Sequence, residues 1–261
     1  MNLDRYRLFA FDLDGTLLTR AGELAPSTVK LVKHITERAE VTLATGRSLA
    51  SARRYLQELA IAVPAILYHG AVVFDPSAHQ PLFESHIPGE LARQVYEVAQ
   101  KFPVHPQLYR SVNDPTIYVP RVTPPIEEFI RKEDLTASQV ADFTNFLEQG
   151  PLKLLFIGDT SILPELADAV QRTLSELTVV RSGENYVEVL PPGVSKGEAL
   201  SWLCDYLDIP LSCAVAVGDQ MSDLSMIERA GLGVAMAHGT EELKRKADLV
   251  IERIEHLAQI L

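Results

Sequence analysis

Cysteine is nearly absent from this chain of 261 residues, which contains only Cys204 and Cys213. Two cysteines spaced in this way form neither a redox motif nor a disulfide framework, so a reducing compartment is expected. Apolar runs approaching about twenty residues, the length of a membrane span, are also missing. Charged residues interrupt the opening segment at positions 4, 5 and 7, which argues against a signal peptide. The sequence therefore predicts a cytoplasmic protein with no membrane partner.

The chain also has fewer positively charged than negatively charged residues. The chain has 24 Lys and Arg against 35 Asp and Glu, a net charge of −11. Nucleic acids and anionic membranes are bound largely by clustered Lys and Arg, so neither is an expected partner. A small anionic substrate is compatible with this charge if basic residues gather locally. Apolar residues make up 47% of the chain, which predicts a packed fold, and the sequence gives no oligomeric state.

Short apolar runs alternate with helical patterns at both ends of the chain. The predicted strands end at turns rich in Asp, Gly and Thr. Alternation of this kind is typical of βαβ units in a parallel sheet, so we predict an α/β fold with a Rossmann-like core. The predicted strands are 6–12, 41–45, 64–68, 213–217, 233–236 and 248–251, and the predicted helices are 26–39, 47–59, 197–207 and 224–230.

The pattern of residues changes between about residue 75 and residue 181. Proline recurs there, and strand-like pieces such as 116–119 and 152–157 lie among amphipathic helices. We interpret this stretch as a second domain inserted into the first.

Three polar residues, Asp12, Thr45 and Asp219, fall at the ends of predicted strands. Ligands of open parallel sheets bind outside the carboxyl ends of the strands, so these residues could converge on one crevice. A carboxylate can attack a phosphate monoester only if cations neutralise the phosphoryl oxygens. Carboxylates are suitable ligands for Mg²⁺, and Asp12 and Asp219 supply two of them. The pattern predicts a magnesium-dependent phosphoryl-transfer site.

Further residues fit the same chemistry. The turn at Gly15 could place Asp14 in a different environment from Asp12, so that one acid is ionised and the other donates a proton. Thr45 offers a hydroxyl donor to a phosphoryl oxygen. Lys196 offers a positive charge at the start of a predicted helix.

The four segments that carry these residues resemble the ordered motifs of haloacid dehalogenase-type phosphatases. They are Asp12-Leu-Asp-Gly-Thr16, Thr45-Gly-Arg47, Gly193-Val-Ser-Lys196-Gly, and Gly218-Asp219 followed by Asp223. The long insertion and the segment 231–236 resemble the Cof-type subfamily. That resemblance implies a catalytic core formed by residues 1–76 and 186–261, and an α/β cap formed by residues 77–185 that sets substrate specificity.

The resemblance also implies roles for individual residues. Asp12 would form an aspartyl-phosphate, with Asp14 as general acid and then general base. Mg²⁺ would be held by the carboxylates of Asp12 and Asp219 and by the backbone carbonyl of Asp14, with Ser222 and Asp223 behind them. The implied phosphate- or substrate-binding residues are Leu13, Gly15, Thr16, Thr45, Gly46, Arg47, His69 and Lys196.

Two positions depart from the subfamily pattern. Ser222 stands before Asp223 where members often have Asn, and His69 stands before Gly70 where they often have Asn. Ser is shorter than Asn and could act through a water, whereas His69 could alter substrate recognition. The other six histidines show no metal-ligand spacing, and we expect them to be structural or exposed.

The expected substrate is a small phosphorylated metabolite, with sugar phosphates first and phosphorylated cofactors such as pyridoxal or flavin phosphates next. Two alternatives stay open. A phosphotransferase or mutase would pass the phosphoryl group to a sugar hydroxyl instead of water. A non-catalytic sensor would keep the site for binding alone, although binding does not require both Asp12 and Asp14.

Overall fold

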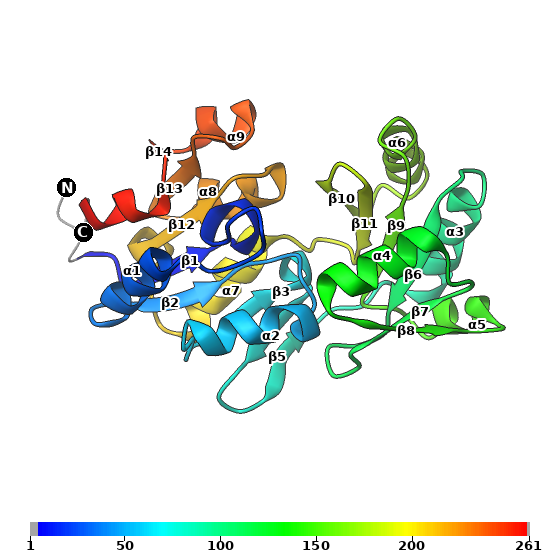
Figure 1. The fold of residues 1–261 in the computed structure, drawn as a ribbon, viewed down its shortest axis with the longest axis horizontal. Coiled ribbons are helices and arrows are strands. Elements are labelled where there is room, and N and C mark those ends of the chain that lie inside the picture. The colour runs from blue at the N-terminus through cyan, green and yellow to red at the C-terminus, as the bar shows by residue number, and fades with distance from the viewer. Residues whose placement is uncertain (1–4, 260–261) are drawn as a thin grey trace. The chain divides into compact units, whose positions relative to one another are not determined.

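A computed structural model describes residues 5–259. The chain forms two compact units (Figure 1). Unit 1 contains the residues up to 46, residues 52–83 and the residues from 195 onward. Unit 2 contains residues 47–51 and 84–194. The chain therefore leaves unit 1 and returns to it, as expected for an insertion.

Unit 1 is built on a five-stranded sheet of order β14-β13-β12-β1-β2, in which every neighbouring pair is parallel. The central strands are apolar and fully buried, as in parallel sheets covered on both faces. This is the Rossmann-like α/β core that the alternation predicts. Its strands are β1 (Leu8–Phe11), β2 (Glu40–Leu43), β12 (Ala214–Gly218), β13 (Leu232–Met236) and β14 (Leu249–Ile251).

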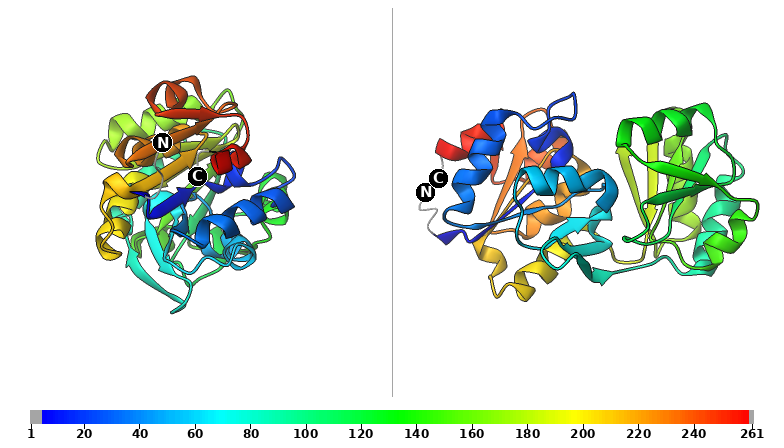
Figure 2. Two further views of the ribbon diagram at one scale, coloured as in Figure 1. Left: turned by 90° about the vertical axis from the view of Figure 1, so that its left-hand side faces the viewer. Right: turned by 60° about the horizontal axis from the view of Figure 1, so that its bottom comes forward.

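Helices cover both faces of this sheet. Apolar side chains of α7, α8 and α9 pack with Leu8, Ala10 and Ala216 into one buried cluster. Helix α1 lies beside β2 on the other face (Figure 2). The helices of unit 1 are α1 (Pro26–Thr36), α7 (Lys196–Tyr206), α8 (Leu224–Arg229) and α9 (Glu241–Lys246), and α2 (Leu49–Glu58) begins in unit 2 and continues into unit 1.

A small sheet of order β3-β4-β5 extends the edge of unit 1. The strand predicted at 64–68 is β3 (Ala65–Leu67), which is joined to the end of β2 by one parallel bridge between Ala44 and Ile66. It pairs antiparallel with β4 (Val72–Asp75), and β5 (Gln80–Glu84) follows. Strand β3 is therefore the start of a hairpin, not a regular member of the parallel sheet.

Unit 2 is an α/β unit with a six-stranded sheet of order β10-β11-β9-β6-β7-β8. Only the pair β7 and β8 is parallel; the other pairs with a described register are antiparallel. The strands are β6 (His105–Tyr109), β7 (Thr116–Val119), β8 (Thr136–Gln139), β9 (Lys153–Ile157), β10 (Thr178–Gly183) and β11 (Tyr186–Leu190). The helices are α3 (Gly89–Ala99), α4 (Pro124–Glu133), α5 (Phe143–Glu148) and α6 (Leu163–Thr173).

The two faces of the unit 2 sheet differ in chemistry. Leu108, Leu154 and Val187 point to one face, where they join an apolar cluster with α3, α5 and α6. On the other face Lys153 and Glu188 form a buried ion pair, with Nζ 2.5 Å from Oε2. The Lys153 ammonium also lies 4.5 Å from the centre of the Tyr109 ring, whose hydroxyl donates to Gln107 Oε1 at 3.3 Å.

The boundaries of the units differ from the expected divisions at 76/77 and 185/186. Residues 77–83 cluster with unit 1 because β5 adds to the hairpin of β3 and β4. Residues 186–194 cluster with unit 2 because β11 pairs with both β9 and β10. The pairing partners of a strand decide both cases, and they carry no signal in the local sequence. No helix among residues 5–259 has the length and hydropathy required to cross a membrane.

Candidate active site

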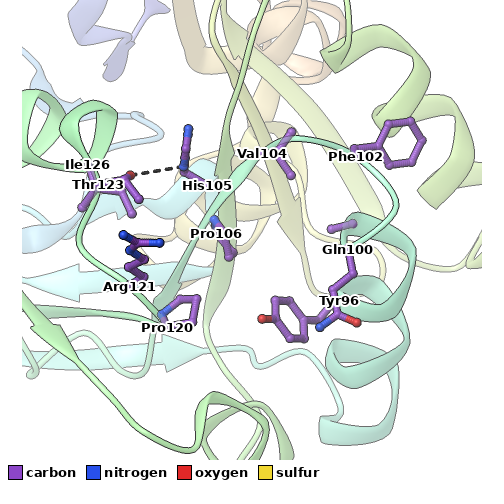
Figure 3. A pocket seen from close by; sticks show the side chains of 11 residues that line it. Tyr96, Gln100, Phe102, Val104, His105, Pro106, Pro120, Arg121, Thr123 and Ile126 are labelled. Carbon is purple, nitrogen blue, oxygen red and sulfur yellow. Dashed lines mark hydrogen bonds between the residues drawn. The ribbon is translucent and has the colours of Figure 1, made fainter.

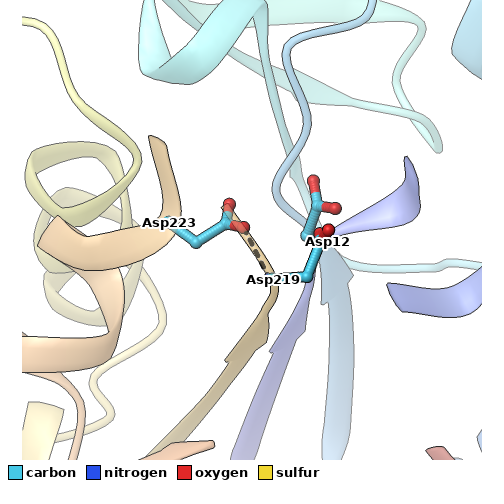
Figure 4. A group of neighbouring side chains, drawn as sticks. All are labelled: Asp12, Asp219 and Asp223. Carbon is cyan, nitrogen blue, oxygen red and sulfur yellow. Dashed lines mark hydrogen bonds between the residues drawn. The ribbon is translucent and has the colours of Figure 1, made fainter. Parts of the chain in front are cut away.

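Asp12 and Asp219 follow directly after two neighbouring strands of unit 1. Asp12 extends β1 and its backbone N–H donates to Val217 O at 2.9 Å, while Asp219 follows the last residue of β12. Because β1 and β12 are parallel neighbours, their carboxyl ends place both carboxylates at the same edge of the sheet (Figure 4). Both side chains are buried.

Lys196 is the buried cation of this edge. It is the first residue of α7, whose N-cap Ser195 accepts a hydrogen bond from the backbone of Glu198. Its ammonium donates to Asp12 Oδ1 at 2.6 Å and to Asp223 Oδ1 at 2.5 Å. Lysine is almost never fully buried without partners. The two carboxylates explain how this side chain is held at 1% exposure.

Asp223 connects Lys196 to the segment after β12. Its second oxygen, Oδ2, accepts hydrogen bonds from the backbone N–H groups of Asp219 and Gln220, both at 2.9 Å. It ends a short helical turn, Met221–Asp223, in which Ser222 is half-buried. Asp223 therefore fixes the ammonium with one oxygen and the backbone at Asp219 with the other.

A tight turn at Leu13–Leu17 carries the second predicted acid. Leu13 is buried, whereas Asp14 is exposed and faces away from the apolar core. Gly15 has a φ of +85°, and a Cβ at this position would overlap the Asp219 carboxylate, so only glycine fits. Thr16 Oγ1 lies 3.5 Å from Asp219 Oδ1.

Thr45 and His69 come together at the end of β2. Thr45 is buried, its N–H donates to Ile66 O at 2.9 Å, and its carbonyl accepts the N–H of His69 at 3.0 Å. The buried His69 ring lies against the backbone of Gly46. Tyr68 and His69 have φ values of 49° and 56°, a conformation that costs non-glycine residues about 1 kcal/mol or more each and that concentrates at functional sites.

The candidate site contains more buried negative charge than positive charge. Burial raises the pKa of Asp12 well above its ordinary value, although the Lys196 ammonium opposes this. Burial likewise raises the pKa of Asp219, and the Asp223 carboxylate adds to the effect. For Lys196, burial works against the ammonium, but the carboxylates of Asp12 and Asp223 outweigh it and raise the pKa.

This donor set fits a divalent cation. Asp12, Asp219 and Asp223 each offer a carboxylate oxygen, and these oxygens lie within 4.8 Å of one another (Figure 4). Carboxylate oxygens are the ligands that Mg²⁺ prefers. One ammonium does not balance three buried carboxylates, so a second cation would complete the charge.

Arg47 has a different neighbourhood from the other predicted residues. It clusters with unit 2, and its Nη1 lies 2.6 Å from Glu133 Oε2 at the end of α4. Both side chains are mostly buried. The predicted residues that unit 1 itself gathers are therefore Asp12, Thr16, Lys196, Asp219 and Asp223 at one centre, with Thr45, Gly46 and His69 at the end of the neighbouring strand β2.

Two residues next to Asp219, Gln220 and His238, are not predicted as site residues from the sequence. Gln220 Nε2 donates to Asp219 Oδ2 at 2.8 Å. His238, which follows β13, places Nε2 2.8 Å from Gly15 O and 4.0 Å from Asp219 Oδ2. An Asp-Gln pair is unremarkable in sequence, and His238 lies 223 residues from Gly15, so no local pattern indicates either contact.

A cavity of about 280 Å³ lies wholly within unit 2 (Figure 3). Tyr96, Phe102 and Val104 give it apolar walls, and a hydrogen bond of 3.2 Å between His105 and Thr123 borders it. None of the predicted site residues lines this cavity. The candidate active site is therefore identified by its clustered side chains and not by this cavity.

Comparison with known proteins gives a consistent result. A family model described as haloacid dehalogenase-like hydrolase matches residues 9–258. The chain is 30% identical over 244 residues to an HMP-PP phosphatase of Serratia proteamaculans, covering 92% of this chain and 86% of the relative. It is 30% identical over 254 residues to the pyridoxal phosphate phosphatase YbhA of Escherichia coli, covering 94% and 93%. The crystal structure of TM0651 from Thermotoga maritima superposes with a TM-score of 0.83 at 28% identity, covering 98% and 97%.

Proposed function

This chain belongs to the haloacid dehalogenase-like hydrolases and is a phosphoric monoester hydrolase of their Cof-type branch, and from this premise we propose a Mg²⁺-dependent phosphatase with Asp12 as its nucleophile. The observation that carries the proposal is the buried pair of Asp12 and Lys196, 2.6 Å apart at a strand end. A nucleophilic carboxylate needs a fixed cation beside it to approach an anionic phosphoryl group.

In the first step an oxygen of Asp12 attacks phosphorus, and the bond between phosphorus and the leaving oxygen breaks. Asp14 donates a proton to that oxygen, so the product leaves as an alcohol. The exposure of Asp14 supports this role because a general acid must reach the leaving group. The product of the step is an aspartyl-phosphate on Asp12.

In the second step Asp14, now ionised, takes a proton from a water molecule. The resulting hydroxide attacks phosphorus, and the bond between phosphorus and the Asp12 oxygen breaks. Inorganic phosphate leaves, Asp12 is again a carboxylate and Asp14 is again protonated. One residue thus serves both half-reactions in opposite protonation states.

The phosphoryl group is held by the Thr45 hydroxyl, the Lys196 ammonium and the backbone around Gly15 and Gly46. His69 lies at the same strand end as Thr45, and its left-handed backbone supports a role in recognising the substrate. Asp223 keeps Lys196 in place, with Ser222 beside it.

The residues that would hold Mg²⁺ are Asp12 and Asp219 through their carboxylates and Asp14 through its backbone carbonyl. The ion would supply positive charge for the phosphoryl oxygens when bound. The raised pKa values of Asp12 and Asp219 support this assignment because both carboxylates lack full compensation of their charge.

The substrate that we propose is a small phosphorylated metabolite, either a sugar phosphate or a phosphorylated cofactor. One relative is named for pyridoxal phosphate, a phosphorylated cofactor, which favours the cofactor class. We assign substrate selection to unit 2, as the cap of the enzyme. The cytoplasm is the location that fits two free thiols, Cys204 and Cys213.

The test is phosphate release from a panel of sugar and cofactor monoesters, with Mg²⁺ or with EDTA. We expect turnover that requires Mg²⁺ and falls by more than about 10⁴-fold in Asp12→Asn. The matched control is Asp208→Asn, an exposed aspartate of unit 1, which should retain full activity.

Each alternative has its own outcome. If the native protein transfers phosphate between sugars without releasing it, the mutase takes the place of the hydrolase. If it binds the esters but neither releases nor transfers phosphate, the sensor does. Equal activity in the native protein and Asp12→Asn would eliminate Asp12 as the nucleophile.

A further inference from the structure

We propose that His238 is a positioning residue that holds the Asp14 turn in its productive geometry. This inference rests on the proposed function, since it assigns a role within the same reaction. His238 acts through the backbone of Gly15 and not by contact with the substrate.

The contact itself is specific. His238 Nε2 lies 2.8 Å from the carbonyl oxygen of Gly15. A carbonyl only accepts hydrogen bonds, so Nε2 must carry the proton and donate. Gly15 immediately follows Asp14, and its carbonyl belongs to the peptide that leads into Thr16. The imidazole is therefore tied to the middle of the turn that carries the proposed acid.

The loop that presents His238 is itself well anchored. It connects β13 to α9, and hydrogen bonds tie it to β13, to β14, to α9 and to Asp219. Its hydrogen bonds are Ala237 N to Ile251 O at 2.8 Å, Gly239 N to Met236 O at 2.9 Å, Thr240 N to Asp219 O at 3.0 Å, and Lys244 Nζ to Ala237 O at 3.2 Å.

This loop also lies directly against Asp219. A Cβ on Gly239 would be 2.6 Å from the carbonyl oxygen of Asp219, so the two backbones approach as closely as glycine permits. One loop thus contacts two acid-bearing segments, Asp219 through Thr240 and the Asp14 turn through His238.

The turn that carries Asp14 needs a contact from outside the turn to fix its geometry. Gly15 contributes no side chain and adopts a left-handed conformation, and Asp14 is exposed. A proton donor must be placed precisely with respect to the leaving oxygen, and displacements of about 1 Å cost up to about 10²-fold in rate. The separation of 4.0 Å between His238 Nε2 and Asp219 Oδ2 exceeds hydrogen-bonding distance, so Gly15 is the partner that Nε2 engages.

The exposure of His238 makes the idea testable. Its side chain is 54% exposed, so replacing it removes little buried surface and should leave stability intact. A loss of activity in a stable variant would then report on the Gly15 contact.

The experiment compares His238→Ala, His238→Gln and His238→Asn by steady-state kinetics at saturating Mg²⁺. Glutamine places an amide donor near the position of Nε2, whereas asparagine places it near Nδ1. We expect kcat to fall about tenfold in the alanine and asparagine variants, with KM changed less than about twofold, and to recover in the glutamine variant. His34→Ala, an exposed histidine of α1, is the control that should match the native protein.

Hydrogen exchange supplies a second readout that needs no activity. Peptides covering residues 13–18 should exchange faster in His238→Ala and return to the native rate in His238→Gln. Unchanged kcat and unchanged exchange in His238→Ala would overturn the proposal. A native protein that releases no phosphate would overturn the proposed function, and the exchange data would still decide whether His238 holds the turn.

Discussion

The ammonium of Lys196 lies 2.6 Å from Oδ1 of Asp12, although 184 residues separate them in the chain. Asp12 directly follows the first strand of unit 1, and Lys196 begins the helix that follows the return from unit 2. Both side chains are buried, so the pair is the charged centre of the unit. Its integrity should govern both catalysis and stability.

Replacing Lys196 with methionine should abolish phosphate release and destabilise the fold. The change leaves the carboxylates of Asp12 and Asp223 buried without their cation, at a cost of about 3–5 kcal/mol in the free energy of unfolding. Urea unfolding at pH 7.5 measures this loss. The loss should shrink at pH 5, because burial raises the pKa of Asp12 and a protonated Asp12 no longer needs the Lys196 cation.

The control is Lys246→Met, which removes an exposed ion pair with Glu228 of similar length. Exposed pairs contribute about 0–1 kcal/mol, so this variant should resemble the native protein. A Lys196→Met protein as stable as the control would contradict the buried-pair interpretation.

Replacing Asp14 with asparagine should trap the covalent intermediate. A substrate with a good leaving group, such as p-nitrophenyl phosphate, needs little protonation in the first step, whereas hydrolysis still needs a base. Intact-protein mass spectrometry should therefore find one added phosphoryl group in Asp14→Asn. The double variant with Asp12→Asn should show no such addition, and finding one there would assign the phosphoryl group to another residue.

Mg²⁺ should stabilise the protein more at pH 8 than at pH 5. Burial raises the pKa of Asp12 and Asp219, so the folded protein binds protons more tightly than the unfolded chain. The contribution of Asp12 and Asp219 to the free energy of unfolding is complete below the ordinary pKa of Asp. It is lost as pH rises through the pKa that these residues have in the folded protein. At 100 times its dissociation constant, Mg²⁺ would add about 2.7 kcal/mol where these carboxylates are ionised, and less where protons compete.

Thermal unfolding with Mg²⁺ or EDTA at the two pH values checks this expectation. Asp219→Asn removes one proposed ligand and keeps the shape of the side chain, so it should lose most of the Mg²⁺ increment. An increment that is independent of pH, or that persists in Asp219→Asn, would place the ion elsewhere.

The ion pair of Lys153 and Glu188 in unit 2 should behave as a coupled unit. Lys153→Met alone leaves a buried carboxylate and should cost about 3–5 kcal/mol, whereas adding Glu188→Met should recover most of that loss. A double-mutant cycle measures the coupling. Hydrogen exchange at residues 153–157 reports unit 2 directly, and additive losses would show that the two residues are uncoupled.

Much of unit 1 can be predicted from its sequence because its strands are short apolar runs that end in polar turns. Asp12 after β1 and Asp219 after β12 are examples, and the parallel sheet brings them together as the strand-end rule requires. Lys196 at the start of α7 is also foreseeable from its motif. These positions depend on local pattern plus one general rule of sheet topology.

Other features depend on contacts that no local pattern encodes. Strand β11 belongs to unit 2 because it pairs with β9 and β10, and β5 belongs to unit 1 because it joins the sheet of β3 and β4. The burial of Lys153 and Glu188 appears only once three strands lie in register. The contact of His238 with Gly15 likewise arises from the meeting of two loops.

The return of the chain to unit 1 has a consequence for biosynthesis. Strand β1 lies between β2 and β12 in the sheet, and β12 begins 206 residues after β1 does, at Ala214 against Leu8. On the ribosome the apolar β1 must therefore wait, with one edge unpaired, until unit 2 has been translated and β12 has emerged. A nascent chain of this enzyme should need protection by chaperones during that interval, and a product truncated within unit 2 should aggregate.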